Sequence, residues 1–333
     1  MPGNVAGFAA LQGAFGKLPW QRDIARAEQL ATTGFAISPA LAARLATAQD
    51  LIRLDASLAS EFLDESGHPK PAGSHVANRE LGETLALIRT NGSAGFYRGD
   101  ITASIAAYVA AQGGAVPTGE LAGYRPLRAQ ASESTFGSAT AYLPSPQVAP
   151  GNFASALLAN VRGLRTENPQ FDMARGVGMA TARTIDQLHV AALPQDLGST
   201  GFAAVDGTGQ AVACAVSMNG PFGSGHTAES TGVTLARAPS RTEAGIATIF
   251  LSPIIATTSG TIALVGAGAG GPNGNASLAY TVMRLAAEQN VISSQSSTGA
   301  APYDTFNMIA CQNARCAAIA DPGGAGLGIA MGK

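Results

Sequence analysis

A hairpin pattern near residue 200 constrains the fold of this 333-residue chain more than any other feature. Two short apolar segments, 201–206 and 210–218, flank Gly207-Thr208-Gly209. A turn that contains Gly between two such segments is typical of antiparallel strands joined as a hairpin. Ser199 and Thr200 stand at the start of the first strand, and the second strand leads into Ser217-Met218-Asn219-Gly220-Pro221. The pattern therefore predicts a strand pair with hydroxyl and amide side chains at its end.

The rest of the sequence predicts helices before this hairpin, and strands followed by a helix after it. Apolar residues recur at three- and four-residue spacing, which indicates helices, over 25–33, 39–48, 78–89, 101–112 and 153–164. Asp100 is expected to cap the fourth helix, and a further short helix is expected within 179–193. Strands are expected at 247–250 and 261–265, followed by a glycine-rich turn at 266–273 and a helix. This order predicts an α+β layered fold with a largely antiparallel sheet core.

The charge balance indicates a small-molecule partner rather than a nucleic acid or a membrane surface. The 20 Lys and Arg residues are scattered, and with 22 Asp and Glu residues they give a net charge of −2, so no basic patch is expected. No segment approaches the ~18–20 consecutive apolar residues of a membrane span. The first residues lack a basic stretch followed by an apolar one, so no secretory leader is expected here. The 41 Gly residues indicate either tightly packed layers or a GC-rich genome.

The three cysteines predict one disulfide and no metal site. Cys214 falls in an apolar strand and is expected to be a small core residue. Cys311 and Cys316 bracket four residues, a spacing that would allow a local disulfide in an oxidising compartment. Two cysteines without a nearby pair of histidines fall short of the usual metal ligands. We therefore expect neither a metal nor another cofactor.

Ser199 is a candidate nucleophile. A hydroxyl attacks well only when a base removes its proton. If the chain were cut between Gly198 and Ser199, the new α-amine of Ser199 would be such a base, because its pKa of about 7.7–8.0 leaves a fair fraction uncharged near neutral pH. Gly198 would permit the strained geometry that self-cleavage needs. The alternative is that Ser199 and Thr200 merely cap the start of a strand.

Two other clusters could serve the same chemistry, and each has a plainer interpretation. Ser217 and Asn219 share one face of a strand, where they could hold a nucleophile and a substrate, but Asn219-Gly220-Pro221 is also strong turn chemistry. Backbone N–H groups of 266–271 could bind an oxyanion or a phosphate. Their spacing matches a dinucleotide fingerprint only formally, because the required βαβ unit is not clearly present. His226 follows the hairpin and is either part of a site or a surface residue.

Short motifs in the right order along nearly the whole chain resemble the gamma-glutamyltransferases, which belong to the N-terminal-nucleophile hydrolases. The less specific matches are Pro2-Gly3-Asn4-Val5-Ala6-Gly7, Phe96-Tyr97-Arg98-Gly99, Gly113-Gly114, Leu121-Ala122-Gly123-Tyr124 and residues 142–151. The most specific matches are Val205-Asp206, Asn219 with Phe222-Gly223, Glu229-Ser230, Ser252-Pro253 and Gly270-Gly271. This many ordered matches is hard to reach by chance.

The resemblance implies a four-layer αββα sandwich, made as one precursor and cut into a heterodimer of a large-subunit-like region, 1–198, and a small-subunit-like region, 199–333. It places Ser199 at the nucleophile, with Thr200 beside it, and Ser217 at a second hydroxyl that contacts the nucleophile. Asn219 would help to hold the amine of the substrate, and Gly270 and Gly271 would form the oxyanion hole. The implied reaction is attack on a γ-glutamyl amide such as glutathione, then transfer of the glutamyl group from its ester to water or an amine.

Departures from the family pattern bear on the substrate. The first segment of the family fold, with an Arg that binds the substrate α-carboxylate, is expected to be absent. Ile249 and Phe250 replace paired Ser that also bind that carboxylate, and an Asp pair that receives the amine is missing from 235–241. We therefore expect either a self-processing γ-glutamyl hydrolase or acyltransferase, or a catalytically weak or inactive homologue that binds a ligand or partner. Because the family is usually exported, a periplasmic or secreted location is expected if the full-length gene encodes a leader.

Overall fold

The computed structural model describes residues 2–162, 169–193, 196–238, 246–292, 305–313, 315–320 and 326–330. The chain divides into two compact units. Unit 1 comprises Met1–Leu127 and Phe222–Arg237, and unit 2 comprises Arg128–Pro221 and Ala238–Lys333. All the residues proposed from the sequence for catalysis lie in unit 2.

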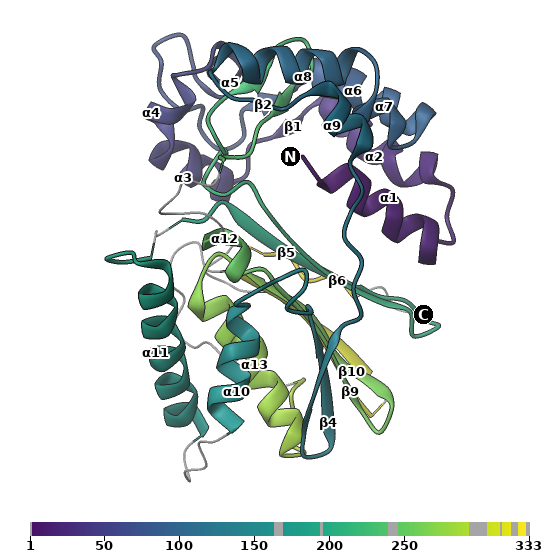
Figure 1. Ribbon diagram of the computed structural model, residues 1–333, viewed down its shortest axis with the longest axis vertical. Coiled ribbons are helices and arrows are strands. Elements are labelled where there is room, and N and C mark those ends of the chain that lie inside the picture. Colours follow the sequence, from purple (N-terminus) through teal and green to yellow (C-terminus); the bar gives the residue numbers. More distant parts are fainter. Residues whose placement is uncertain are drawn as a thin grey trace. The chain divides into compact units, whose positions relative to one another are not determined.

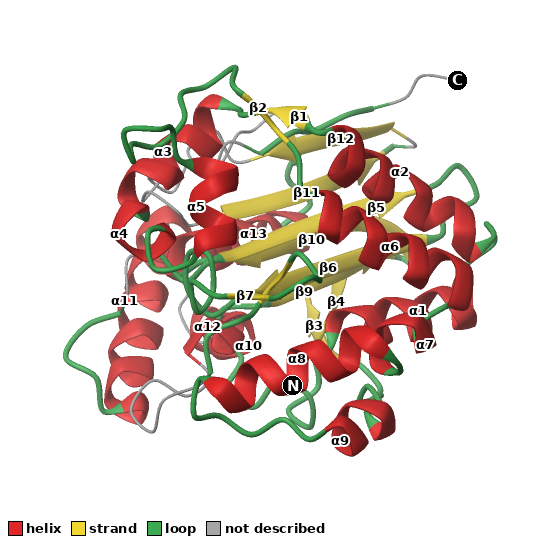
Figure 2. Ribbon diagram, turned by 90° about the horizontal axis from the view of Figure 1, so that it is seen from above, coloured by secondary structure: helices red, strands yellow, loops and turns green. Residues whose placement is uncertain are grey.

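Unit 1 is mainly helical (Figure 2). Its helices are α1 (Asn4–Phe15), α2 (Trp20–Thr33), α3 (Pro39–Thr47), α4 (Gln49–Ile52), α5 (Ala56–Phe62), α6 (Arg79–Asn91), α7 (Ala94–Tyr97), α8 (Asp100–Ala111) and α9 (Thr118–Gly123). Its short strands are β1 (Phe35–Ala36), β2 (His75–Val76), β7 (Thr227–Ala228) and β8 (Val233–Thr234). Two hydrophobic clusters hold these elements, one around Phe96 and Ile105 and one around Leu45 and Ile52.

The four helices expected before residue 113 are confirmed as α2, α3, α6 and α8, but the predicted cap of α8 is wrong. Gly99, with φ of 78°, occupies the N-cap position, and Asp100 is the first helical residue. The helix ends before Gly113, whose φ of 77° is a left-handed conformation that favours glycine after a helix.

Unit 2 contains a six-stranded antiparallel sheet in the order β12-β11-β10-β9-β4-β3. Its strands are β3 (Ser132–Phe136), β4 (Ala139–Leu143), β9 (Ser252–Thr258), β10 (Thr261–Ala269), β11 (Thr305–Gln312) and β12 (Arg315–Ala320). A second sheet consists of β5 (Ser199–Val205) and β6 (Ala211–Ser217), which are the predicted hairpin. The α+β class and the antiparallel core are thereby confirmed.

Helices cover one face of the six-stranded sheet, and the β5–β6 pair packs on the other (Figure 1). The helices are α10 (Phe153–Arg162), α11 (Pro169–Leu188) and α13 (Pro272–Ala286). Successive residues of a strand point to opposite faces, and β10 shows this directly. A Cβ on Gly266 would meet Leu278 of α13, whereas Ala267 lies against Gly201 of β5. Unit 2 is therefore a stack of helices, sheet and second sheet.

The two sheets of unit 2 lie unusually close together. Cα atoms of β5 and β10 approach within 8 Å, whereas stacked sheets are usually about 10 Å apart. A Cβ on Gly201 would lie 2.6 Å from the carbonyl oxygen of Ala267, so this spacing requires glycine. At this position a glycine allows the two sheets to pack closely, which agrees with one of the two explanations given for the high glycine content.

Several expectations about the second half of the chain need correction. The predicted strand at 247–250 is instead the short helix α12 (Ile246–Ile249). The helix expected within 179–193 is longer and begins ten residues earlier, and the turn expected at 266–273 is shorter, because β10 continues to Ala269. Strands β11 and β12 were not predicted.

The C-terminal hairpin contains the predicted disulfide. Cys311 of β11 stands opposite Cys316 of β12, and their sulfur atoms are bonded. Cys214 is a free, half-buried thiol in β6, and burial raises its pKa. In the part of the chain that the structure describes, no helix combines the length and the apolar character that crossing a bilayer requires.

Candidate active site

Ser199 and Ser217 face each other across the β5–β6 pair. They are register partners, and their Oγ atoms lie 2.9 Å apart. Both hydroxyls also lie within reach of the carbonyl oxygen of Leu197, at 3.1 Å from Ser199 and 3.0 Å from Ser217. The backbone N–H of Asn219 donates to Ser217 Oγ at 2.8 Å. When Ser217 directs its single proton to Leu197, its oxygen is an acceptor for the proton of Ser199.

Gly198 precedes this pair in a conformation that only glycine fits. Its φ is 56°, and a Cβ there would lie 1.9 Å from the carbonyl oxygen of Gly220. The N–H of Gly198 donates to Asp196 Oδ1 at 2.7 Å, and the N–H of Gly220 donates to Leu197 at 3.0 Å. These bonds fix the peptide between Leu197 and Gly198, directly before the bond between Gly198 and Ser199.

The carbonyl of Gly198 accepts one backbone hydrogen bond and lies near the Ser217 hydroxyl. The N–H of Met218 donates to its oxygen at 3.0 Å, and Ser217 Oγ lies 3.5 Å from it. Donors placed on a carbonyl oxygen stabilise the negative charge that develops when a nucleophile adds to the carbon. The continuous chain therefore combines a buried hydroxyl, Ser199, with a polarised carbonyl on the residue before it.

The structure separates Ser199 from its neighbour Thr200. The side chain of Ser199 is directed toward Ser217, and the residue is 6% exposed. Thr200, the next residue along β5, is exposed. Asn219 lies in the turn after β6 with φ of 57°, a left-handed conformation that asparagine tolerates better than most residues. The turn interpretation of Asn219 is therefore confirmed. The expectation that Asn219 and Ser217 share a strand face is wrong, because β6 ends at Ser217, and it is the backbone N–H of Asn219 that contacts the Ser217 hydroxyl.

Gly270 and Gly271 form the junction between β10 and α13. Gly270 has φ of 90°, and Gly271 is the N-cap of α13, with Pro272 as the first helical residue. Asn275, in the first turn of α13, donates from Nδ2 to the carbonyl of Gly271 at 2.7 Å and to that of Phe250 at 3.1 Å. Asn275 was not among the residues predicted from the sequence. The sequence offered one signal for this residue, an Asn four positions after a Gly at the start of a helix. That signal does not predict the contact of Asn275 with Phe250.

Ile249 and Phe250, which the resemblance places at a serine pair, belong to the apolar core. Phe250 is fully buried, with its ring centroid 5.0 Å from that of Phe153. Ile249 is partly buried against the same cluster. Of the region where the Asp pair was expected to be missing, residues 239–241 lie outside the described residues.

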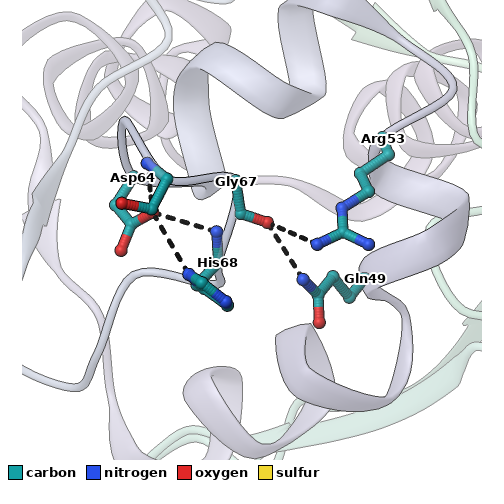
Figure 3. Close-up of polar contacts among 6 residues, drawn as sticks. Gln49, Arg53, Asp64, Gly67 and His68 are labelled. Carbon is teal, nitrogen blue, oxygen red and sulfur yellow. Dashed lines mark hydrogen bonds and ion pairs between the residues drawn. The ribbon is translucent and has the colours of Figure 1, made fainter.

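Three of the four histidines, His68, His75 and His226, belong to unit 1. His226 belongs to unit 1, where its Nδ1 lies 3.3 Å from Tyr108 Oη. His68 lies in a turn of the same unit, in which Asp64 accepts its N–H at 2.9 Å and Gly67 accepts from Gln49 and Arg53 (Figure 3). The His68 N–H also lowers the pKa of Asp64. Among the described residues, no group of three or more His, Cys, Asp or Glu side chains is placed to hold a metal ion.

Comparison with known proteins identifies relatives over much of the chain. Glutathione hydrolase 2 of Arabidopsis thaliana is 28% identical over 206 residues, which are 61% of this chain and 34% of that protein. The glutathione hydrolase proenzyme of Escherichia coli is 30% identical over 124 residues, 37% of this chain and 21% of the relative. The chain thus matches about a third or less of the length of these relatives.

A solved structure shares the fold. The cephalosporin acylase from Bacillus halodurans superposes with a TM-score of 0.65 at 15% identity, covering 96% of this chain and 75% of that chain. The predicted α+β sandwich is thereby confirmed as the fold class. The family model of gamma-glutamyltranspeptidase matches residues 1–188, more than half of the chain. This protein therefore belongs to the gamma-glutamyltranspeptidase family.

Proposed function

We propose that the chain cuts itself between Gly198 and Ser199, and that it then hydrolyses or transfers γ-glutamyl amides such as glutathione with Ser199 as the nucleophile. One observation carries the proposal. The Oγ atoms of Ser199 and Ser217 lie 2.9 Å apart, directly after a Gly198 carbonyl that accepts from Met218 at 3.0 Å. Family membership and the shared fold support the same chemistry.

Self-cleavage would begin with attack of Ser199 Oγ on the carbonyl carbon of Gly198. The N–H of Met218 and the hydroxyl of Ser217 would stabilise the resulting oxyanion. The C–N bond then breaks, the proton of the Ser199 hydroxyl passes to the departing nitrogen, and an ester joins Gly198 to Ser199 Oγ. Water hydrolyses this ester, which leaves a carboxylate on Gly198 and a free α-amine and hydroxyl on Ser199.

Turnover would use the new α-amine as the base. The uncharged amine takes the proton of Ser199 Oγ while the oxygen attacks the amide carbonyl of the substrate. Backbone N–H groups of Gly270 and Gly271 would stabilise the oxyanion, and the proton would pass to the leaving amine. Water or an acceptor amine then attacks the acyl-enzyme ester and frees Ser199. Because the amine must be uncharged, the rate should rise with pH through about 7.7–8.0.

Two features support Ser199 over Thr200 as the nucleophile. Ser199 pairs with Ser217 across the two strands, and it directly follows Gly198, whose carbonyl accepts a hydrogen bond from the N–H of Met218. Thr200 is exposed. We also propose that Asn219 helps to bind the substrate amine, and that the cut divides the chain into the regions 1–198 and 199–333 as two subunits.

A second candidate function is that of a weakly active or inactive homologue that binds a ligand or partner. The burial of Phe250 against Phe153 favours it, because this position offers no hydroxyl to a substrate α-carboxylate. An unpaired buried carboxylate is costly, so a γ-glutamyl group would bind poorly without other donors. Because a cephalosporin acylase has the same fold, a test of substrates should also include a cephalosporin amide.

The decisive experiment follows the intact mass of the purified chain during incubation and sequences the N-terminus of any smaller species. We expect two polypeptides that meet between Gly198 and Ser199, followed by release of p-nitroaniline from γ-glutamyl-p-nitroanilide. Ser199→Ala should abolish both, and Thr200→Ala should leave both in place. Cleavage that survives in Ser199→Ala and disappears in Thr200→Ala would move the nucleophile by one residue. A chain that stays whole for days would favour the binding homologue.

A further inference from the structure

Asn275 has no role in the proposed chemistry so far, yet it is bonded to both segments beside the proposed oxyanion hole. It is fully buried in unit 2, at the first turn of α13. Its Nδ2 donates to Gly271 at 2.7 Å and to Phe250 at 3.1 Å. One amide group thus ties the end of the α12 segment to the turn that starts α13.

Asn275 holds a turn whose own residues offer few backbone anchors. Gly270 and Gly271 are flexible by nature, because glycine has access to conformations that other residues avoid. Pro272 has no N–H, so the peptide between Gly271 and Pro272 offers only its carbonyl as an anchor. Asn275 uses this carbonyl. An oxyanion hole needs donors that are already in place before charge develops, and the Asn275 bond supplies such a constraint at Gly271.

The hydrogen bonding of Asn275 is one-sided. Both bonds come from Nδ2, and Oδ1 has no hydrogen-bond partner among the residues that the structure describes. A buried polar atom without a partner lowers stability. An apolar side chain of similar size would avoid this cost, so the donor half of the amide is what the site uses.

We propose that Asn275 is a positioning residue for the oxyanion hole: through its bonds to Gly271 and Phe250 it fixes the Gly270-Gly271 turn in the geometry that binds the transition state. The inference rests on the proposed function. It does not extend to self-cleavage, because the oxyanion of that step forms on Gly198, next to Met218 and Ser217. The two reactions of one protein therefore respond differently to the loss of Asn275.

The test measures self-cleavage and steady-state hydrolysis of γ-glutamyl-p-nitroanilide and a cephalosporin amide in four variants. Asn275→Ala removes both bonds, and Asn275→Leu does so while keeping the volume. Asn275→Ser keeps a donor four residues after Gly271, a position from which a hydroxyl can reach that carbonyl. Asn152→Ala is the matched control, since Asn152 is also buried and donates to Leu251 at 3.0 Å and to Ser252 at 3.1 Å.

We expect Asn275→Ala and Asn275→Leu to cleave themselves within about twofold of the wild-type rate and to lose roughly 10- to 100-fold in kcat at a nearly unchanged KM, somewhat less than the loss of an entire oxyanion donor. The kcat of Asn275→Ser should fall between the kcat of these variants and that of the wild type, and Asn152→Ala should keep its kcat.

An unchanged kcat in Asn275→Leu would overturn the inference. The inference would also be overturned if the Asn275 variants and Asn152→Ala lost self-cleavage and kcat to the same extent, because that result would indicate a general loss of packing in unit 2. A wild-type chain that cleaves but hydrolyses neither substrate would overturn the proposed function, and this inference with it.

Discussion

The hydroxyl oxygens of Ser199 and Ser217 lie 2.9 Å apart although 18 positions separate the two residues in sequence. The β5–β6 register creates this contact, because it places the first residue of one strand opposite the last residue of the other. The same register puts Met218 on the carbonyl of Gly198. The hairpin therefore brings the proposed nucleophile and its neighbours together in the uncut chain.

Ser217→Ala should slow self-cleavage without preventing folding. The change removes the acceptor for the Ser199 proton and the weaker of the two donors near Gly198, and we expect a loss of about tenfold, or ~1.4 kcal/mol in the barrier. Timed intact-mass spectra of freshly purified protein measure the rate. Ser217→Thr should restore most of it, and Thr200→Ala serves as the control on the exposed neighbouring hydroxyl. Equal rates in Ser217→Ala and the wild type would contradict the role given to Ser217.

Gly198→Ala should destabilise unit 2 and block self-cleavage. The new Cβ would lie 1.9 Å from Gly220, and φ of 56° is unfavourable for alanine, so we expect a loss of at least about 1–3 kcal/mol in the free energy of unfolding. Urea denaturation measures this loss. Gly207→Ala, in the hairpin turn with nothing within 4 Å of its Cβ position, is the matched control. A Gly198→Ala chain as stable as the control would show that the backbone before Ser199 is not constrained as described.

Replacing both Cys311 and Cys316 by Ser should lower stability by about 2 kcal/mol, as chain-entropy arguments give for so short a loop. Urea denaturation of the oxidised wild type and the double variant measures the difference. Titration of thiols in denaturant provides the check on the bond itself, because one of the three cysteines should react before reduction and all three after it. Three reactive thiols in unreduced protein would contradict the disulfide.

Glu61→Gln should stabilise unit 1 at neutral pH. Burial raises the pKa of Glu61, although the hydrogen bond from Asn78 at 3.1 Å and the charge of Lys70 oppose the shift. Since the folded state holds this proton more tightly than the unfolded chain, whose Glu pKa is about 4.3, stability falls as pH rises from that value through the raised pKa. Urea denaturation at pH 4 and pH 7 should show the gain in Glu61→Gln mainly at pH 7. Glu65→Gln, at an exposed position, is the control, and an equal gain at both pH values would refute the assignment.

The β5–β6 hairpin could be predicted because its signal is local. Two apolar segments flank a glycine turn, and the pairing partners lie close in sequence, so the existence of both strands followed from the sequence. Their ends did not, because β5 begins at Ser199 rather than at 201 and β6 spans Ala211–Ser217 rather than 210–218. The pairing of Ser199 with Ser217, expected from family resemblance, then required only the correct register. The role of these residues in catalysis stays a prediction.

The failures come from short apolar segments and from contacts that are distant in sequence. Residues 247–250 could form a strand or a helix turn, and burial of Ala247 and Phe250, three apart, matches the helix that forms. Gly266 and Gly268 looked like turn residues, but they lie in β10 because α13 packs directly against them, where a Cβ would meet Leu278 and Gly274. The contact of Asn275 with Phe250 spans 25 positions, and no local sequence pattern predicts it.

The pairing of β4 with β9 has a consequence for any cut between Gly198 and Ser199. Ala141 stands before that bond and Ala256 after it, yet they are neighbours in one sheet, and α10 packs against α13 in the same way. The two resulting polypeptides would both contribute strands and helices to the core of unit 2. They would melt together in one transition, would not separate on dilution, and neither would fold if it were produced alone.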